Sequence, residues 1–94
     1  MARIVWSRIA RNELSAIVSY IWVDSPTYAR AFGLRLRQRI SQLEDFPESG
    51  RLVPEDATNI YRELIVGNYR VIYRYYGGTV TIVTVIHGAR TLRL

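Results

Sequence analysis

Apolar residues in the first half of the chain recur at the spacing of two amphipathic helices. Ser7 is a suitable N-cap residue, and the stripe after it predicts a helix from about residue 8 to 23. Pro26 fits the first turn of a second helix that ends near Phe46-Pro47. The two stripes are Ala10, Leu14, Ile17, Val18 and Ile21, then Ala29, Phe32, Leu36, Ile40 and Leu43. Because the link between the helices is so short, they are expected to form an antiparallel hairpin.

Elsewhere the apolar pattern is typical of strands and loops. Residues 2–6 form a short candidate strand, and residues 47–54 with the polar residues after them read as a loop. After about residue 60 the period is two, so YRELIV, NYRVIYRYY and TVTIVTVIH predict three strands, with turns at Gly67-Asn68 and Gly77-Gly78. The predicted fold class is α+β. It comprises an N-terminal strand, the antiparallel helical hairpin and a three-stranded antiparallel meander, with the helices packed on one face of the sheet.

The two tight turns predict a register, and with it the two faces of the sheet. The expected pairs are Tyr76 with Thr79, Tyr73 with Ile82, Arg70 with Val85, Asn68 with His87, Val66 with Tyr69 and Ile65 with Arg70. The face expected to lie on the helices holds Leu64, Val66, Tyr69, Val71, Tyr73, Val80, Ile82 and Ile86. The uncovered face holds Tyr61, Glu63, Arg70, Ile72, Arg74, Tyr76 and His87, with Val83 and Val85 between them. This register predicts that Arg70 and His87 share the uncovered face.

Length and composition narrow the class of protein. The chain has 94 residues, 49% of them apolar, which predicts a single folded domain over residues 1–94. A net charge of +5 and a pI of about 10.1 predict an acidic partner, whether nucleic acid, an acidic protein or a membrane surface. All 13 basic residues are arginine, which suits phosphate recognition but is also expected from a genome rich in G and C.

Several other classes are disfavoured. With no cysteine and a single histidine, neither a disulfide framework nor a metal site is expected, and no cofactor is predicted. No apolar run approaches the roughly 20 residues of a membrane span, and the N-terminus lacks the core of a signal peptide. The expected location is therefore the cytoplasm, with no membrane partner.

The polar sheet face suits a ribose-phosphate chain, with guanidinium groups on phosphate and aromatic rings on bases. It also suits RNA cleavage by attack of the 2′-hydroxyl on its own phosphorus. In that reaction His87 would shuttle a proton, and Arg70 would stabilise the phosphorane. A structural interpretation is equally open, with His87 as a half-exposed packing residue and Arg70 in an ion pair with Glu63. The second helix has a basic side, which is interpreted as a solvated face, with contact to nucleic acid or a partner as the alternative. Its residues are Arg30, Arg35, Arg37 and Arg39.

The order of elements, with FPESGRLVPE, then RELIVGNYRVIYRYY, then TIVTVIHGARTL, resembles the RelE/ParE superfamily of bacterial type II toxin–antitoxin toxins. The similarity covers almost the whole chain, and its most specific parts are YRVIYR and VIHGAR. The resemblance implies a small toxin of the kind linked to plasmid stabilization. A cognate antitoxin would wrap and neutralise it in a hetero-oligomer, with growth arrest when the antitoxin is degraded.

RelE-like members are mRNA interferases, endoribonucleases that cut mRNA in the ribosomal decoding site with a basic, concave sheet surface and no metal. By this resemblance Arg70 and Arg90 match two arginines of the RelE-like pattern, and His87 replaces a tail tyrosine that the chain lacks. These three residues are the predicted catalytic set. The predicted RNA and phosphate contacts are Arg51, Tyr61, Arg62 and Arg74. Ribosome-associated mRNA cleavage is the function that these residues favour.

ParE-like members instead poison DNA gyrase, and the long hairpin and the histidine that ends the last strand look similar to that branch. Gyrase poisoning is therefore the alternative. An inactive relative that only binds its antitoxin, and a plain nucleic-acid-binding domain, are two more. Relatives also suggest that the antitoxin packs across the hairpin and the sheet edge, where an exposed apolar groove is expected. A chain this basic further predicts an acidic antitoxin.

Overall fold

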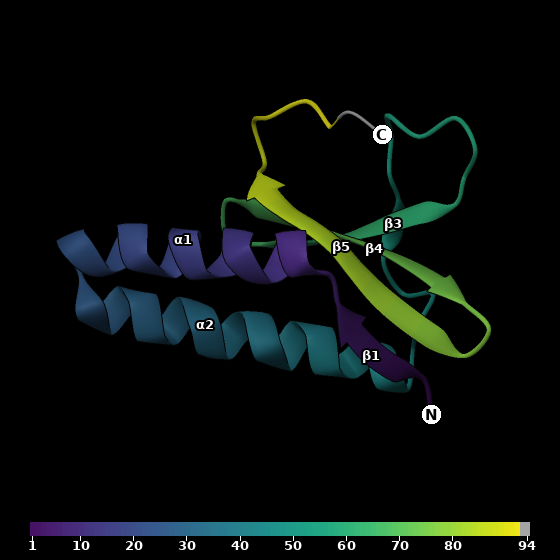
Figure 1. Ribbon diagram of the computed structural model, residues 1–94, viewed down its shortest axis with the longest axis horizontal. Coiled ribbons are helices and arrows are strands. Elements are labelled where there is room, and N and C mark those ends of the chain that lie inside the picture. The colour runs from purple at the N-terminus through teal and green to yellow at the C-terminus, as the bar shows by residue number, and fades with distance from the viewer. Residues whose placement is uncertain (93–94) are drawn as a thin grey trace.

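The computed structural model describes residues 1–92 and has an α+β fold, with two long helices against one side of a twisted sheet (Figure 1). The elements are β1 (Arg3–Trp6), α1 (Arg8–Asp24), α2 (Pro26–Ser41), the 3₁₀ turn η1 (Gln42–Glu44), β2 (Arg51–Leu52), β3 (Tyr61–Val66), β4 (Tyr69–Tyr76) and β5 (Thr79–His87). The predicted fold class is confirmed. Two details differ, because η1 ends the second helix early and β2 lies inside the predicted loop.

The strands form one five-stranded sheet in the order β1-β5-β4-β3-β2. The predicted antiparallel meander, β3 to β5, makes up its centre, and β1 joins in parallel beside β5. The first strand of the chain therefore pairs with the last. On the other side of β1 no strand follows among residues 1–92, so β1 is an edge strand.

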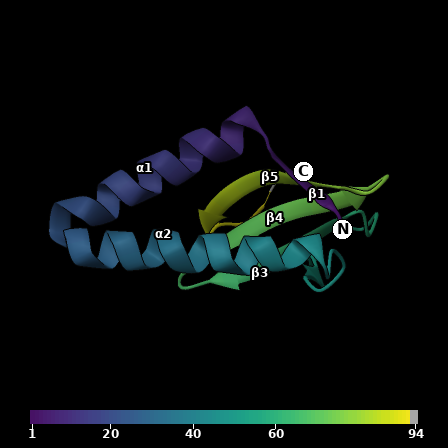
Figure 2. The same ribbon diagram turned by 90° about the horizontal axis from the view of Figure 1, so that it is seen from below.

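Serine side chains cap both helices. Ser7 accepts from the Ala10 N–H at 3.0 Å at the start of α1, and Ser25 accepts from the Tyr28 N–H at 3.1 Å at the start of α2. The hairpin is longer than the sheet, and the end where α1 turns into α2 projects beyond the strands (Figures 1 and 2). Ala10 is the only buried residue of α1, so most of its apolar stripe is half-covered. Within residues 1–92, no helix has the length and apolarity needed to cross a membrane.

The register of β4 and β5 is as predicted near their turn and shifted beyond it. The confirmed pairs of the meander are Tyr76 with Thr79, Tyr73 with Ile82, Val66 with Tyr69 and Ile65 with Arg70. Moving away from the turn, Tyr73 pairs with Ile82, and the preceding residue of β4, Ile72, pairs with Thr84. Val83 is therefore an extra residue in β5, a β-bulge.

Because of the bulge, each side chain at the end of β5 lies on the sheet face opposite to the predicted one. The observed pairs there are Val71 with Val85, Arg70 with Ile86 and Tyr69 with His87. The predicted pairs of Arg70 with Val85 and of Asn68 with His87 are wrong, because a shift by one residue turns every later side chain over. His87 shares the helix-facing side with Tyr69, whereas Arg70 lies on the other face. The prediction that Arg70 and His87 share a face is therefore wrong.

Apolar side chains are buried on both faces of the sheet. The core under the helices includes Phe32, Leu36, Leu43, Val71, Tyr73, Val80, Ile82 and Val85. The opposite face has a smaller cluster of Val53, Ile72, Ile86 and Leu92, with Tyr61 packed against it. Val85 and Ile86 have thus exchanged their predicted faces. The loop after β2 and the segment after β5 lie on the side away from the helices, so the face predicted to be uncovered is partly covered (Figure 1).

Candidate functional site

Arg70, the centre of the predicted site, is buried and bound to two carboxylates. Its side chain is 7% exposed. Its Nε donates to Glu63 Oε1 at 2.6 Å, and its Nη1 and Nη2 donate to the two oxygens of Glu55 at 2.8 and 2.7 Å. The hydrogen bonds from Arg70 to Glu55, and then the one to Glu63, raise the pKa of Arg70. The chain itself therefore occupies every nitrogen of this guanidinium.

Glu63 joins Arg70 to Arg51. Its side chain has 0% exposure, and its Oε2 accepts from Arg51 Nε at 2.6 Å. The ion pair of Arg70 with Glu63, which the adjacent strands allowed, is present and buried. Arg51 itself is 62% exposed, so this predicted phosphate contact presents the rest of its guanidinium to solvent.

Glu55 joins the segment after β5 to the buried cluster, which consists of Arg70, Glu63 and Glu55. Its Oε2 also accepts from the Leu92 N–H at 3.0 Å, while Arg70 Nη1 donates to the Arg90 carbonyl at 3.2 Å. The hydrogen bonds from Arg70 and then from Leu92 lower the pKa of Glu55 from 4.5 to about 2. This carboxylate is ionised at neutral pH and holds the segment over the sheet.

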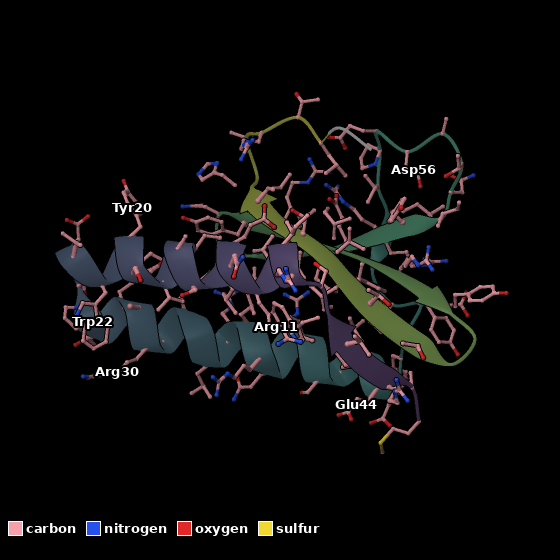
Figure 3. The ribbon with its side chains drawn as sticks, in the orientation of Figure 1. Arg11, Tyr20, Trp22, Arg30, Glu44 and Asp56 are labelled. Atoms are coloured by element: carbon pink, nitrogen blue, oxygen red, sulfur yellow. The ribbon has the colours of Figure 1, made fainter. Side chains whose placement is uncertain are left out.

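Asp56 shapes the loop that carries Glu55, and Figure 3 places it in the loop between β2 and β3. It accepts from the hydroxyl and N–H of Thr58 and from the N–H groups of Ile60 and Tyr61. These bonds, the Thr58 hydroxyl first, lower the pKa of Asp56 from 3.8 to about 2. The loop is a hydrogen-bonded turn that fixes its Glu55 neighbour over Arg70.

The three residues of the predicted catalytic set do not converge. The His87 ring meets the Tyr69 ring edge-on, with 5.5 Å between centroids, and its Nδ1 accepts from the Ala89 N–H at 3.1 Å. Arg90 is exposed and lines a pocket beside α1, so it reaches Arg70 through its carbonyl oxygen alone. Of these three residues, only Arg70 lies in the buried cluster with Glu63 and Glu55.

Two of the predicted RNA contacts lie together near the β4–β5 turn. Arg62 and Arg74 line a pocket of about 410 Å³ with Tyr75 and Tyr76. Arg62 also donates to the Gly50 carbonyl at 2.9 Å, whereas Arg74 is exposed. The last predicted contact, Tyr61, packs against the small apolar cluster on the sheet face away from the helices, here called the outer face.

A larger hollow of about 920 Å³, here called the β1 groove, lies between β1 and the helices. Its lining includes Ile4, Val5, Trp6, Leu14, Val18, Arg11 and Arg37. Figure 3 shows Arg11 between the two helices, close to β1. The groove is apolar with basic residues in its lining, and it adjoins an edge strand. It has the character that was expected of an antitoxin-binding groove.

Across residues 1–92, no group of three or more histidine, aspartate or glutamate side chains is arranged to hold a metal ion.

The family model described as "ParE toxin of type II toxin-antitoxin system, parDE" matches residues 4–92. The chain belongs to the ParE toxin family. This ParE-family toxin is 44% identical over 92 residues to Toxin RelE2 of Caulobacter vibrioides, which covers 96% of the chain and 99% of that relative. Its fold is similar to that of the chromosomal ParDE TA system from P. aeruginosa, with a TM-score of 0.76, 93% of this chain and 96% of that chain covered, and 20% identity.

The predicted membership of the RelE/ParE superfamily is therefore confirmed. The chain is the toxin of a type II toxin–antitoxin system, and an antitoxin is its partner.

Two features that shape the toxin's outer face were not predicted from its sequence. Glu55 gives no local signal, because its contact with Arg70 joins residues from separate elements. The bulge at Val83 does leave a signal. The doublets Ile82-Val83 and Val85-Ile86 interrupt the alternation of apolar residues in β5, which marks a place where the strand changes face.

Proposed function

We propose that this toxin arrests growth by binding and poisoning DNA gyrase, the activity of ParE-like members of its superfamily. The observation that supports this proposal is the state of Arg70, whose nitrogens all donate to Glu55 and Glu63 in a site where its side chain is 7% exposed. A guanidinium that stabilises a phosphorane must be free to meet the developing oxyanion. Here a phosphate would first have to displace a bidentate carboxylate.

The position of His87 supports the same proposal. A general acid or base must come within about 2.6–3.2 Å of the atom whose proton it moves. His87 pairs with Tyr69 on the helix-facing side of the sheet, whereas Arg70 pairs with Ile86 on the other face. One scissile phosphate cannot lie against both side chains, so the observed positions of Arg70 and His87 disfavour RNA cleavage by this set of residues.

The antitoxin is proposed to bind in the β1 groove. Apolar residues such as Trp6 and Leu14 would receive the apolar side of a partner segment, and the edge of β1 offers unpaired backbone groups for an added strand. Arg11 and Arg37 in the lining favour a segment that also carries carboxylates.

The gyrase proposal is tested with purified toxin and purified gyrase. We expect linear plasmid DNA, trapped in covalent complex with gyrase, to accumulate with toxin concentration, while mRNA from cells that express the toxin keeps intact ends in primer extension. Cut mRNA in those cells, without trapped gyrase complexes, would overturn the proposal. A toxin that produces neither effect and does not slow growth would instead be an inactive antitoxin-binding relative.

RNA binding is the second candidate, and the pocket near the β4–β5 turn favours it. Arg62 and Arg74 lie there with Tyr75 and Tyr76, a combination that suits a phosphate and a stacked base. Arg74→Ala separates the two candidates, because Arg74 is exposed and its removal leaves the core untouched. Loss of toxicity in this variant would support ribosome-associated mRNA cleavage, and full toxicity supports gyrase poisoning.

A further inference from the structure

The end of the helical hairpin overhangs the sheet. Figures 1 and 2 show the turn between α1 and α2 beyond the last strand ends. The last turn of α1 and the first turn of α2 therefore have no strand directly beneath them. Between this overhang and the strand ends lies a hollow of about 560 Å³, here called the overhang pocket.

Aromatic rings form much of the overhang pocket. Tyr20 and Tyr28 come from the two helices, and Tyr69 and His87 come from β4 and β5. The strand side is fixed by packing, because Tyr69 meets Phe32 at 5.3 Å and His87 at 5.5 Å, both edge-on. The bulge in β5 is what turns His87 toward this pocket.

Among residues 1–92, the lining of the pocket includes one carboxylate and no arginine. Asp24 is its only acidic residue, and within residues 1–92 Asp24 makes no ion pair although the chain has a net charge of +5. Aromatic faces together with a carboxylate favour a cation, because ring quadrupoles and the negative charge both attract it. The described lining offers no guanidinium to a phosphate or a nucleotide.

We propose that the overhang pocket receives an arginine side chain of the protein that the toxin targets. This inference rests on the proposed function, in which the target is a protein that the toxin binds. The antitoxin is the poorer occupant, because the β1 groove proposed for it contains Arg11 and Arg37 and shares no residue with this pocket. The two hollows thus select partner segments of opposite charge.

The proposal is tested by titrating the full chain with N-acetyl-arginine amide and following backbone amide shifts by NMR. N-acetyl-citrulline amide is the matched probe, because it has the same shape and no charge. We expect shifts centred on Asp24, Tyr28 and His87, with citrulline binding weaker on the order of tenfold. No shifts at these residues up to the solubility limit of the arginine probe, or equal shifts with citrulline, would overturn the proposal.

Two exposed aspartates provide the variant and its control. Asp24→Asn should weaken binding of the arginine probe on the order of tenfold, whereas Asp45→Asn, at an exposed site outside the pocket, should leave it unchanged. Asp24→Asn should also reduce trapping of gyrase by the toxin. Unchanged trapping would overturn the assignment of the pocket to the target. If the wild-type toxin binds the probe through Asp24 but traps no gyrase, the cation site is supported and the proposed function fails.

Discussion

Each oxygen of Glu63 accepts a charged N–H at 2.6 Å, from Arg70 on one side and Arg51 on the other, in a side chain with no exposed surface. A carboxylate removed from water in this way is stable only while its partners remain, because an unpaired buried charge is costly. Arg51 is mostly in solvent, so Arg70 is the partner that matters most. At the scale of the residue, Arg70 is thus a structural group.

Arg70→Ala should therefore destabilise the fold by about 3–5 kcal/mol, because it leaves Glu63 buried with one partner fewer. The measurement is urea unfolding followed by circular dichroism. Arg74→Ala, in the same strand but exposed, is the control and should change stability by less than about 0.5 kcal/mol. The double variant Arg70→Met, Glu63→Leu should recover part of the loss, since it removes the buried pair but leaves the partly exposed Glu55 without its partner.

An Arg70→Ala unfolding midpoint equal to that of the wild type would contradict this account. The same variant is unsuitable as a test of catalysis, because toxicity would be lost through unfolding in either mechanism.

Stability should also fall in acid because of Glu55 and Asp56. Both have a pKa of about 2 in the folded chain, below their ordinary values of 4.5 and 3.8. When a carboxyl group has a lower pKa in the folded chain than in the unfolded chain, its full contribution to stability is present above the unfolded pKa. That contribution is lost as the pH falls through the folded pKa. The urea midpoint should therefore decrease from pH 4.5 toward pH 2.

Glu55→Gln isolates one contribution to this acid dependence. The amide cannot ionise and pairs less strongly with Arg70, so the variant should be less stable at neutral pH and its midpoint should depend less on pH. A variant with the same acid dependence as the wild type would show that Glu55 does not contribute.

Among the elements, β5 depends on α1 where β1 no longer reaches it. Ser7 Oγ donates to the Val83 carbonyl at 2.8 Å, and Glu13 Oε1 accepts from the Thr84 hydroxyl at 2.6 Å and from the Val85 N–H at 3.0 Å. The start of α1 thus supplies the hydrogen bonds that a neighbouring strand would otherwise make. These contacts hold the bulge, and with it the face on which His87 lies.

Glu13→Ala should destabilise the chain by about 1–3 kcal/mol, because it leaves two donors at the edge of β5 without an acceptor. Amide hydrogen exchange at Val85 should become faster, which reports the loss locally. Glu13→Gln keeps an acceptor oxygen and is the matched control, with a smaller effect on both measurements. Equal protection of Val85 in all three proteins would contradict this role.

The sequence predicted elements whose signals are local. Helical spacing, the serine caps and the two glycine-containing turns act within a few residues, so the helices and the meander were predicted correctly. The face of His87 was missed because a bulge inserts one residue into a period of two. Glu55 was missed because long-range packing, and not the loop's own pattern, brings it to Arg70.

For the whole molecule, the excess of arginine should govern how fast the antitoxin binds. The chain has a net charge of +5, and the β1 groove proposed for the antitoxin contains Arg11 and Arg37. Attraction between exposed charges is screened over about 10 Å at 0.1 M salt and about 3 Å at 1 M. We therefore expect the association rate constant to fall on the order of tenfold or more over this range, with a smaller change in the dissociation rate.

Stopped-flow mixing of toxin and antitoxin at several salt concentrations measures both rates. Arg11→Gln and Arg37→Gln should slow association and flatten its salt dependence, because they remove charge from the groove. Arg30→Gln is the matched control. Arg30 lies over the Trp22 ring at the far end of the hairpin, 5.1 Å from its centroid, outside the groove (Figure 3). If Arg30→Gln slowed association as much as the groove variants, net charge alone would account for the rate, and the antitoxin would not be entering through the β1 groove.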